Sequence, residues 1–259
     1  MQRIFHTPEG VRDIYSQECS RKQKLQEKLH RVFHQYGFED IETPTFEYFE
    51  VFSKEVGTIP SRELYKFFDR EGNTLVLRPD FTPSVSRACA TYFNPEKEVV
   101  SLCYTGNTFI NNSSFRGRLK ETTQMGVERM GDDSPEADAE ILAMTVECLL
   151  ATGLTEFQVS VGQVDYYKAI FAQTGMSQEE EEELRELISQ KNYFGVEELV
   201  KNKNMDKSLA RVLSQLPQMF GSTEVLEKAK SLTDNPQALK AVARLEEIYE
   251  KYGRYLNKV

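Results

Sequence analysis

The feature that most constrains the fold of this chain is a change of sequence pattern after Gln163. Before Gln163, short runs with the apolar content of strands alternate with segments whose apolar residues recur every three or four positions. From about residue 164 to residue 252 only the helical periodicity remains, and Glu and Lys are frequent. The pattern predicts a mixed first domain, residues 1–163, and an all-α insertion or subdomain, residues 164–259.

The first part divides into a succession of short elements. An amphipathic helix is expected over residues 16–36, where Gly37 ends it as a C-terminal cap. Two pairs of strands are expected further along, and polar turn or loop residues separate the strands of each pair. The expected elements after the first helix are a strand at 38–41, a helix at 47–54, strands at 64–69 and 74–78, a helix ending near 92, strands at 99–111 and 121–130, a helix at 135–152 and a strand at 156–161.

Glycines and prolines divide the second part into short helices. The run Glu179–Glu183 is expected to begin one of them, because acidic residues are stabilised at the N-terminal end of the helix dipole. The expected breaks are at Gly175, Gly195, Pro217, Gly221 and Pro236.

Composition and charge weigh against two classes of partner. The 259 residues carry a formal net charge of −9, whereas binding to a phosphate backbone is driven by Lys and Arg, so nucleic acid is not expected. No stretch reaches the roughly 18 apolar residues that a membrane span needs. The N-terminus shows neither an apolar run nor a cleavage signal. These observations predict a cytoplasmic protein that does not bind membranes.

The cysteines and histidines do not form a recognisable metal motif. His30 and His34 are four residues apart on the first expected helix, but no HExxH pattern accompanies them, so a solvated or dimer-facing pair is expected rather than a metal site. No Ser or Cys nucleophile motif and no Gly-rich phosphate loop occurs, and no cofactor or metal is expected. Buried or free thiols are expected at the widely spaced Cys19, Cys89, Cys103 and Cys148.

The stretch LRPDFTPSVSRA places an acid and a hydroxyl group where a strand ends and a helix begins. Asp80 could hold an ammonium group, and Thr82 could add a hydrogen bond. The alternative, that one of them only caps the helix, stays open on this stretch alone. Pro83 suits the first helical turn, where its missing N–H costs nothing.

A second polar group is expected on the strand at 121–130. Strand side chains alternate between the two faces, so Thr122, Gln124, Gly126 and Glu128 share one face of the sheet. A Gln and a Glu beside an Asp and a Thr would form a polar pocket suited to an amino acid or an imidazole.

Four stretches of the chain resemble class II aminoacyl-tRNA synthetases, and among them histidyl-tRNA synthetases. LHRVFHQYGFEDIETPTFE resembles motif 1, TPEGVRDIY the N-terminal signature, YKFFDREGNTLVLRPDFTPSVSRA a histidine-binding stretch, and residues 106–128 motif 2. The resemblance implies an α+β fold, in which a mostly antiparallel sheet is flanked by helices, and a homodimer formed through motif 1. It also implies that Asp80 and Thr82 hold the α-amino group of histidine and that Gln124 and Glu128 line the histidine pocket.

Departures from motif 2 bear on catalysis. The motif has an arginine that grips the α-phosphate of ATP, and Ile110 stands in its place; Asn112 replaces an acid, while the loop keeps Arg116 and Arg118. Losing one preorganised donor of this kind costs about 10²–10³ in rate. Motif 3 and the rest of the family's core are not found in the sequence, which implies a shortened core or a fragment.

The region 157–200 resembles ATP phosphoribosyltransferase regulatory subunits more than histidyl-tRNA synthetases. This resemblance implies a non-catalytic subunit that is required for the first step of L-histidine biosynthesis. It further implies a short-form catalytic subunit as partner and L-histidine as an effector in feedback regulation. The alternative is a histidyl-tRNA synthetase or a truncated piece of one.

Overall fold

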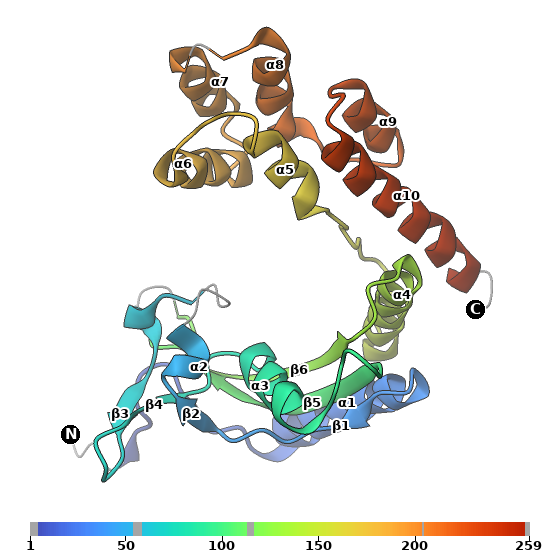
Figure 1. The fold of residues 1–259 in the computed structure, drawn as a ribbon. Helices are drawn as coiled ribbons and strands as arrows, with labels where there is room; N and C mark the ends of the chain where they lie inside the picture. The colour runs from blue at the N-terminus through green and yellow to red at the C-terminus, as the bar shows by residue number, and fades with distance from the viewer. Residues whose placement is uncertain (1–4, 54–58, 113–116, 204, 257–259) are drawn as a thin grey trace. The chain divides into compact units, whose positions relative to one another are not determined.

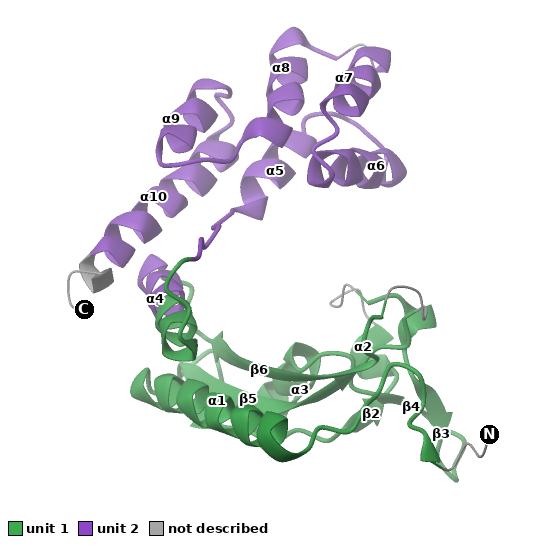
Figure 2. Cartoon of the chain, turned by 180° about the vertical axis from the view of Figure 1, so that it is seen from behind, with its two compact units in different colours: residues 1–133, 144–156 green, residues 134–143, 157–259 purple. Residues whose placement is uncertain are grey.

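The computed structural model describes residues 5–53, 59–112, 117–203 and 205–256, and it shows helices and two small sheets (Figure 1). Its contacts divide the chain into two units (Figure 2). Unit 1 comprises residues 1–133 and 144–156, and unit 2 comprises residues 134–143 and 157–259. This division lies a few residues before the change of sequence pattern at 163, and it assigns the start of one helix to unit 2.

The main sheet of unit 1 contains β1 (Glu39–Asp40), β5 (Val100–Phe109) and β6 (Glu121–Met130), in the order β1-β5-β6. β1 runs parallel to β5, and the long pair β5–β6 is antiparallel. This pair agrees with the strands expected at 99–111 and 121–130.

Two helices meet the opposite faces of this sheet (Figure 2). α3 (Thr82–Tyr92) packs its apolar side against β5. α1 (Ser16–Gln35) lies on the other face, where Lys22 Nζ donates a hydrogen bond to Thr123 Oγ1. Both helices were expected close to these bounds, and the turn at Gly37 follows α1 with a φ of +78°. The buried cluster between α3 and β5 is Phe81, Val85, Cys89, Val100, Leu102 and Tyr104.

The second sheet of unit 1 is small and antiparallel. It contains β2 (Phe46–Tyr48), β4 (Thr74–Leu77) and β3 (Lys66–Phe68), in the order β2-β4-β3. The expected hairpin is therefore confirmed. A 3-10 turn, η2 (Ser61–Glu63), precedes β3.

The helix expected at 47–54 is wrong at its start. Residues 46–48 form β2, and the helix α2 covers only Glu50–Ser53. Phe46 and Tyr48 pair with Leu77 and Leu75 across the ladder, so β4 has a partner on each side. Residues 46–48 form a strand rather than a helix because they pair with β4, which lies almost thirty residues further along the chain.

The strand expected at 156–161 is also wrong. Residues 154–163 follow α4 (Pro135–Thr152) as an irregular segment without strand pairing, and Phe157 and Val161 are 37% and 51% exposed. A strand must satisfy its backbone N–H and C=O groups on a neighbouring strand. Within the described residues no strand lies alongside this segment.

Unit 2 is helical and encloses its own core. Ile170, Leu184, Val196, Leu213 and Val242 are buried in one cluster of side chains from five different helices. The expected break at Gly195 is wrong, because this glycine lies inside α7. The helices are α5 (Val164–Phe171), α6 (Gln178–Ser189), α7 (Tyr193–Asn202), α8 (Lys207–Gln215), α9 (Glu224–Ser231) and α10 (Pro236–Leu256), with a 3-10 turn η3 (Leu216–Gln218) after α8.

The acidic start expected at 179–183 is confirmed. α6 begins after Ser177, whose Oγ accepts a hydrogen bond from the N–H of Glu180, while the Glu180 carboxylate accepts from the N–H of Ser177. This reciprocal pair is a capping box. None of the helices in the described part of the chain is both long and apolar enough to cross a membrane.

Candidate functional site

The register of β5 and β6 sets the polar face of the main sheet. Gly106 lies opposite Gln124, Tyr104 opposite Gly126, and Leu102 opposite Glu128. Because directly opposed residues point to the same face, Gln124, Gly126 and Glu128 share the face that α3 covers. The common face inferred from the period of two is therefore confirmed.

The four residues expected to form a polar pocket converge at the start of α3. Thr82 Oγ1 donates to Glu128 Oε1 over 2.6 Å, and Gln124 Nε2 donates to Asp80 Oδ1 over 3.2 Å. We call Asp80, Thr82, Tyr104, Gln124 and Glu128 the polar cluster. It joins the mouth of one helix to the middle of a strand some 40 residues away in sequence.

The capping alternative for this stretch does not describe the structure. The N-cap residue of α3 is Phe81, and no side chain caps the helix. Asp80 Oδ1 instead accepts from the N–H of Phe81 at 2.7 Å, and Thr82 directs its hydroxyl to Glu128. Both side chains therefore face the sheet.

Tyr104 is a member of the cluster that sequence reasoning missed. Its hydroxyl accepts from Gln124 Nε2 at 3.3 Å, and its ring stacks on Phe81 with centroids 4.3 Å apart. The hydroxyl lies directly above Gly126, where a Cβ atom would collide with it. Opposition to Gly126 is the signal that could have identified Tyr104, but it requires the register of the two strands.

Arg78 packs against the ring of Phe81, which stacks on Tyr104 of the polar cluster. It is 8% exposed, and its guanidinium donates to the carbonyl oxygens of Asn107 at 2.8 Å and Thr43 at 2.9 Å. The same group lies 4.1 Å from the centroid of the Phe81 ring. Gly106 admits this arrangement, because a Cβ there would collide with Arg78 and Phe81. Arg78 thus ties β4, β5 and α3 together.

The polar cluster brings two carboxylates, those of Asp80 and Glu128, into one partly buried site. Burial raises the pKa of Glu128, the charge of Asp80 raises it further, and the Thr82 hydrogen bond acts in the opposite direction. Burial and the two carboxylates raise the pKa of Tyr104 to about 12. Among the described residues neither Asp80 nor Glu128 has an ion-pair partner. Desolvated carboxylates of this kind suit a ligand that brings its own positive charge.

Replacing Glu128 with glutamine is expected to change how stability depends on pH. A carboxyl whose folded pKa lies above its unfolded pKa contributes stability that is present at low pH and is lost as pH rises through the folded value. The wild type should therefore lose stability relative to Glu128→Gln as pH rises from below the ordinary pKa of a glutamate. Urea unfolding of both proteins at a series of pH values measures this difference.

The control for that experiment is Glu71→Gln, which removes one charge from the exposed turn between β3 and β4. A difference between wild type and Glu128→Gln that stayed constant across the pH series would contradict the raised pKa.

The motif 2 loop begins at the end of β5. The N–H of Ile110 donates to the carbonyl oxygen of Lys120 at 2.9 Å, and Asn112 Nδ2 donates to the carbonyl oxygen of Leu119 at 3.4 Å. Arg118 is exposed, and Arg116 lies outside the described residues. Ile110 is half-buried and offers this site a hydrocarbon side chain only.

Comparison with known proteins now identifies the family. The family model described as Histidyl-tRNA synthetase matches residues 10–259 of this chain. The chain belongs to the histidyl-tRNA synthetase family. The α+β fold expected from the class II resemblance is thereby confirmed.

Several curated relatives within this family carry another name. A protein of Acetivibrio thermocellus named ATP phosphoribosyltransferase regulatory subunit is 40% identical over 244 residues, which are 94% of this chain and 58% of that protein. One of the same name from Clostridium acetobutylicum is 37% identical over 258 residues, 97% of this chain and 63% of the relative. This chain therefore spans about three fifths of the length of these relatives.

Solved structures of the family agree with this placement. A crystal structure from Bacillus halodurans, titled as an ATP phosphoribosyltransferase regulatory subunit/histidyl-tRNA synthetase, matches with a TM-score of 0.89 at 30% identity and covers 98% of this chain and 66% of that one. Histidyl-tRNA synthetase from Nostoc matches 97% of this chain and 58% of its own, with a TM-score of 0.76 at 19% identity, which shows the shared fold alone.

Proposed function

We propose that this chain is a non-catalytic regulatory subunit of ATP phosphoribosyltransferase, which is required for the first step of L-histidine biosynthesis. The observation that carries the proposal is the identity of 37–40% to proteins of that name over 94–97% of the chain. The resemblance of residues 157–200 to the same proteins supports it independently of motifs 1 and 2.

Ile110 supports the non-catalytic part of the proposal. A synthetase must place a cation on the phosphate that reacts with the amino acid, and a branched hydrocarbon cannot stabilise that charge. Loss of one such donor costs about 10²–10³ in rate. The neighbouring Asn112 is engaged with the backbone of its own loop through Leu119.

The polar cluster supports L-histidine as the ligand of this subunit. Asp80 offers a carboxylate and Thr82 a hydroxyl group for the α-ammonium group of histidine, and Gln124 and Glu128 would line the pocket beside them. Binding of histidine would regulate the complex if one state of the complex held histidine more tightly than the other. The same pocket that a synthetase uses for its substrate would then serve as an effector site.

The partners follow from the same proposal. The subunit assembles with a short-form ATP phosphoribosyltransferase catalytic subunit in the cytoplasm and forms a homodimer through the motif 1 segment at α1 and β1. Only Val32 and Phe33 are buried among the described side chains of the 20-residue helix α1, which leaves much of its surface for a second copy. Size-exclusion chromatography that gave only monomer would count against the homodimer.

The decisive experiment compares two activities of the purified protein. With ATP and L-histidine alone, pyrophosphate exchange should be undetectable, and an active histidyl-tRNA synthetase serves as the positive control. Added to a short-form catalytic subunit, the protein should raise phosphoribosyltransferase activity. Exchange at synthetase rates, or no activation of the catalytic subunit, would overturn the proposal, and the first outcome would favour a synthetase.

A further inference from the structure

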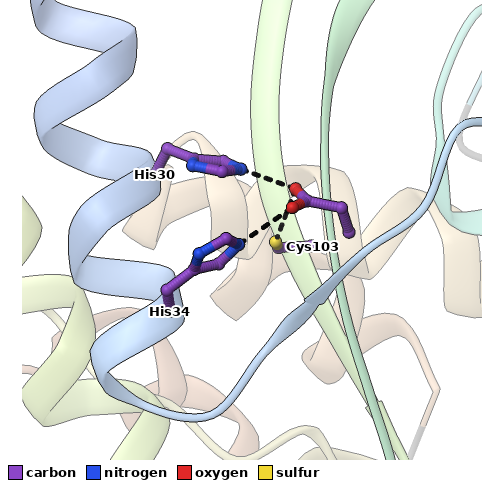
Figure 3. A group of neighbouring side chains, drawn as sticks. His30, His34 and Cys103 are labelled. Carbon is purple, nitrogen blue, oxygen red and sulfur yellow. Dashed lines mark hydrogen bonds and ion pairs between the residues drawn. The ribbon is translucent and has the colours of Figure 1, made fainter.

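Four side chains with metal-binding donor atoms meet on the side of unit 1 where α1 crosses the sheet (Figure 3). His30 and His34 come from α1, Asp40 from β1 and Cys103 from β5. One donor atom of each lies within 4.8 Å of the other three. None of these residues belongs to the polar cluster.

Local structure explains how distant residues reach this point. His30 and His34 are four residues apart, so they share one face of α1. Gly37, with a φ of +78°, then reverses the chain so that β1 returns beneath the helix. In the parallel pair of β1 and β5, Asp40 is the direct partner of Cys103. The four positions are therefore set by helix period, turn and strand register.

The donor atoms already converge on the carboxylate. His30 Nε2 lies 2.6 Å from Asp40 Oδ1, His34 Nε2 lies 2.9 Å from Asp40 Oδ2, and Cys103 Sγ donates to Oδ1 over 3.5 Å. The two imidazole rings are 4.1 Å apart at their centroids. The simplest function of this arrangement is structural: its hydrogen bonds hold α1 against the sheet.

The surroundings of the four side chains favour a bound cation over a purely structural set of hydrogen bonds between α1 and the sheet. An open pocket of about 530 Å³ adjoins the group, and its lining includes His30, Asp40, Glu27 and Glu42. Among the described residues, three carboxylates and no Lys or Arg line this pocket, so its potential attracts positive charge. In the single chain His30, His34 and Asp40 are each partly exposed to solvent, so an ion can reach them there.

We propose that His30, His34, Asp40 and Cys103 form a binding site for a divalent transition-metal ion of the Zn²⁺ type. Two imidazoles, a thiolate and a carboxylate are the donors that Zn²⁺ prefers, whereas Mg²⁺ and Ca²⁺ require oxygen. Bond lengths of about 2.0 to 2.3 Å place tetrahedral donors about 3.3 to 3.7 Å apart. Donor atoms that are now up to 4.8 Å apart need to close by roughly 1 Å, and the two His–Asp pairs at 2.6 and 2.9 Å need to open by about 0.5 Å.

Binding has a defined proton balance. Burial and the nearby Asp40 raise the pKa of the Cys103 thiol to about 12, so the sulfur is protonated in the metal-free protein. The hydrogen bond to His30 lowers the pKa of Asp40, which is already a carboxylate. Formation of the metal–sulfur bond therefore releases the thiol proton, and the His–Asp hydrogen bonds are exchanged for metal–nitrogen and metal–oxygen bonds.

The test titrates the full chain with Co²⁺, which takes the place of Zn²⁺ and absorbs light. One Co²⁺ per chain should bind, with visible bands of a tetrahedral site and a near-ultraviolet sulfur-to-cobalt band. Cys103→Ser should abolish the sulfur band, and His34→Ala should weaken binding by more than about 100-fold, because loss of an outer-shell partner alone costs about 10- to 100-fold. Zn²⁺ added to the metal-free protein should release one proton per chain, whereas Zn²⁺ that displaces bound Co²⁺ should release none, because the thiol is already deprotonated.

Matched controls are Cys148→Ser and His6→Ala, which change the same residue types outside the group and should leave the titration unchanged. Circular dichroism of each variant checks that it folds, and the exposed His34 gives a test that does not disturb the buried Cys103. Absence of Co²⁺ binding would leave only the hydrogen-bonded contact between α1 and the sheet, and a sulfur band that survives Cys103→Ser would place the metal on another cysteine. Either result would overturn the proposal.

Discussion

Replacement of Asp80 with asparagine should weaken L-histidine binding to this protein by about 30- to 150-fold. The substitution keeps the size of the side chain and its acceptor for the N–H of Phe81, but it removes one of the two carboxylates in the polar cluster. Losing a partly desolvated charge partner costs about 2 to 3 kcal/mol of binding free energy, which is this change in affinity. Isothermal titration calorimetry of the two proteins with L-histidine measures it.

The matched control is Asp165→Asn, which removes the same charge from the exposed surface of α5 in unit 2. Its affinity for L-histidine should equal that of the wild type. Equal affinities for Asp80→Asn and the wild type would place the histidine site elsewhere, although the regulatory role tested with the catalytic subunit would still stand.

Replacement of Arg78 with methionine should lower the free energy of unfolding by about 3 to 5 kcal/mol. Methionine keeps the unbranched apolar stem but leaves the carbonyl oxygens of Thr43 and Asn107 without their donor. Each hydrogen bond from a charged donor contributes about 1.5 to 3 kcal/mol, and a buried acceptor without a partner adds a desolvation cost. Urea unfolding followed by circular dichroism measures the change.

Arg62→Met provides the comparison, because the Arg62 side chain is 83% exposed and lies 3.9 Å from the carboxylate of Glu63. An exposed pair of this kind contributes about 0 to 1 kcal/mol. A loss of less than about 1 kcal/mol for Arg78→Met would mean that water satisfies the freed carbonyl groups as well as the guanidinium does. Hydrogen exchange in β5 would then be unchanged as well.

The polar cluster illustrates how far sequence reasoning reached. The alternation of side chains along a strand predicted the common face of Gln124 and Glu128, and the structure shows it. The stretch LRPDFTPSVSRA singled out Asp80 and Thr82, for which the resemblance to histidyl-tRNA synthetases implied a binding role, and both hydrogen-bond to those two side chains. Tyr104 was not predicted as a member of the cluster, because its position above Gly126 depends on which residues lie opposite one another in the two strands.

The two wrong elements fail for a related reason. Residues 46–48 have a pattern compatible with a helix, but they pair with β4 through backbone hydrogen bonds and so form a strand. Residues 156–161 have the apolar content of a strand, but no strand among the described residues lies beside them. Whether a short apolar segment becomes a strand depends on a neighbour, and the segment itself does not encode that neighbour.

The surroundings of His30 and His34 also depend on contacts between distant segments of the chain. Their spacing placed them together on one helix face, and because no HExxH pattern accompanies them they were expected to be a solvated or dimer-facing pair. Asp40 and Cys103 join them because β1 pairs with β5 across more than sixty residues of chain. The spacing of the cysteines along the sequence could not reveal this encounter.

The sequence alone therefore determined most local features of this protein: most of the helices, the two hairpins, the common face of Gln124 and Glu128, and a family signature long enough to imply the fold. The tertiary structure alone decided which segments became neighbours, and with them the positions of Tyr104, Arg78 and Cys103 in their clusters. The physical reason is that helix and strand periods arise within a few residues of backbone. Strand register and burial arise only when distant parts of the chain exclude water together.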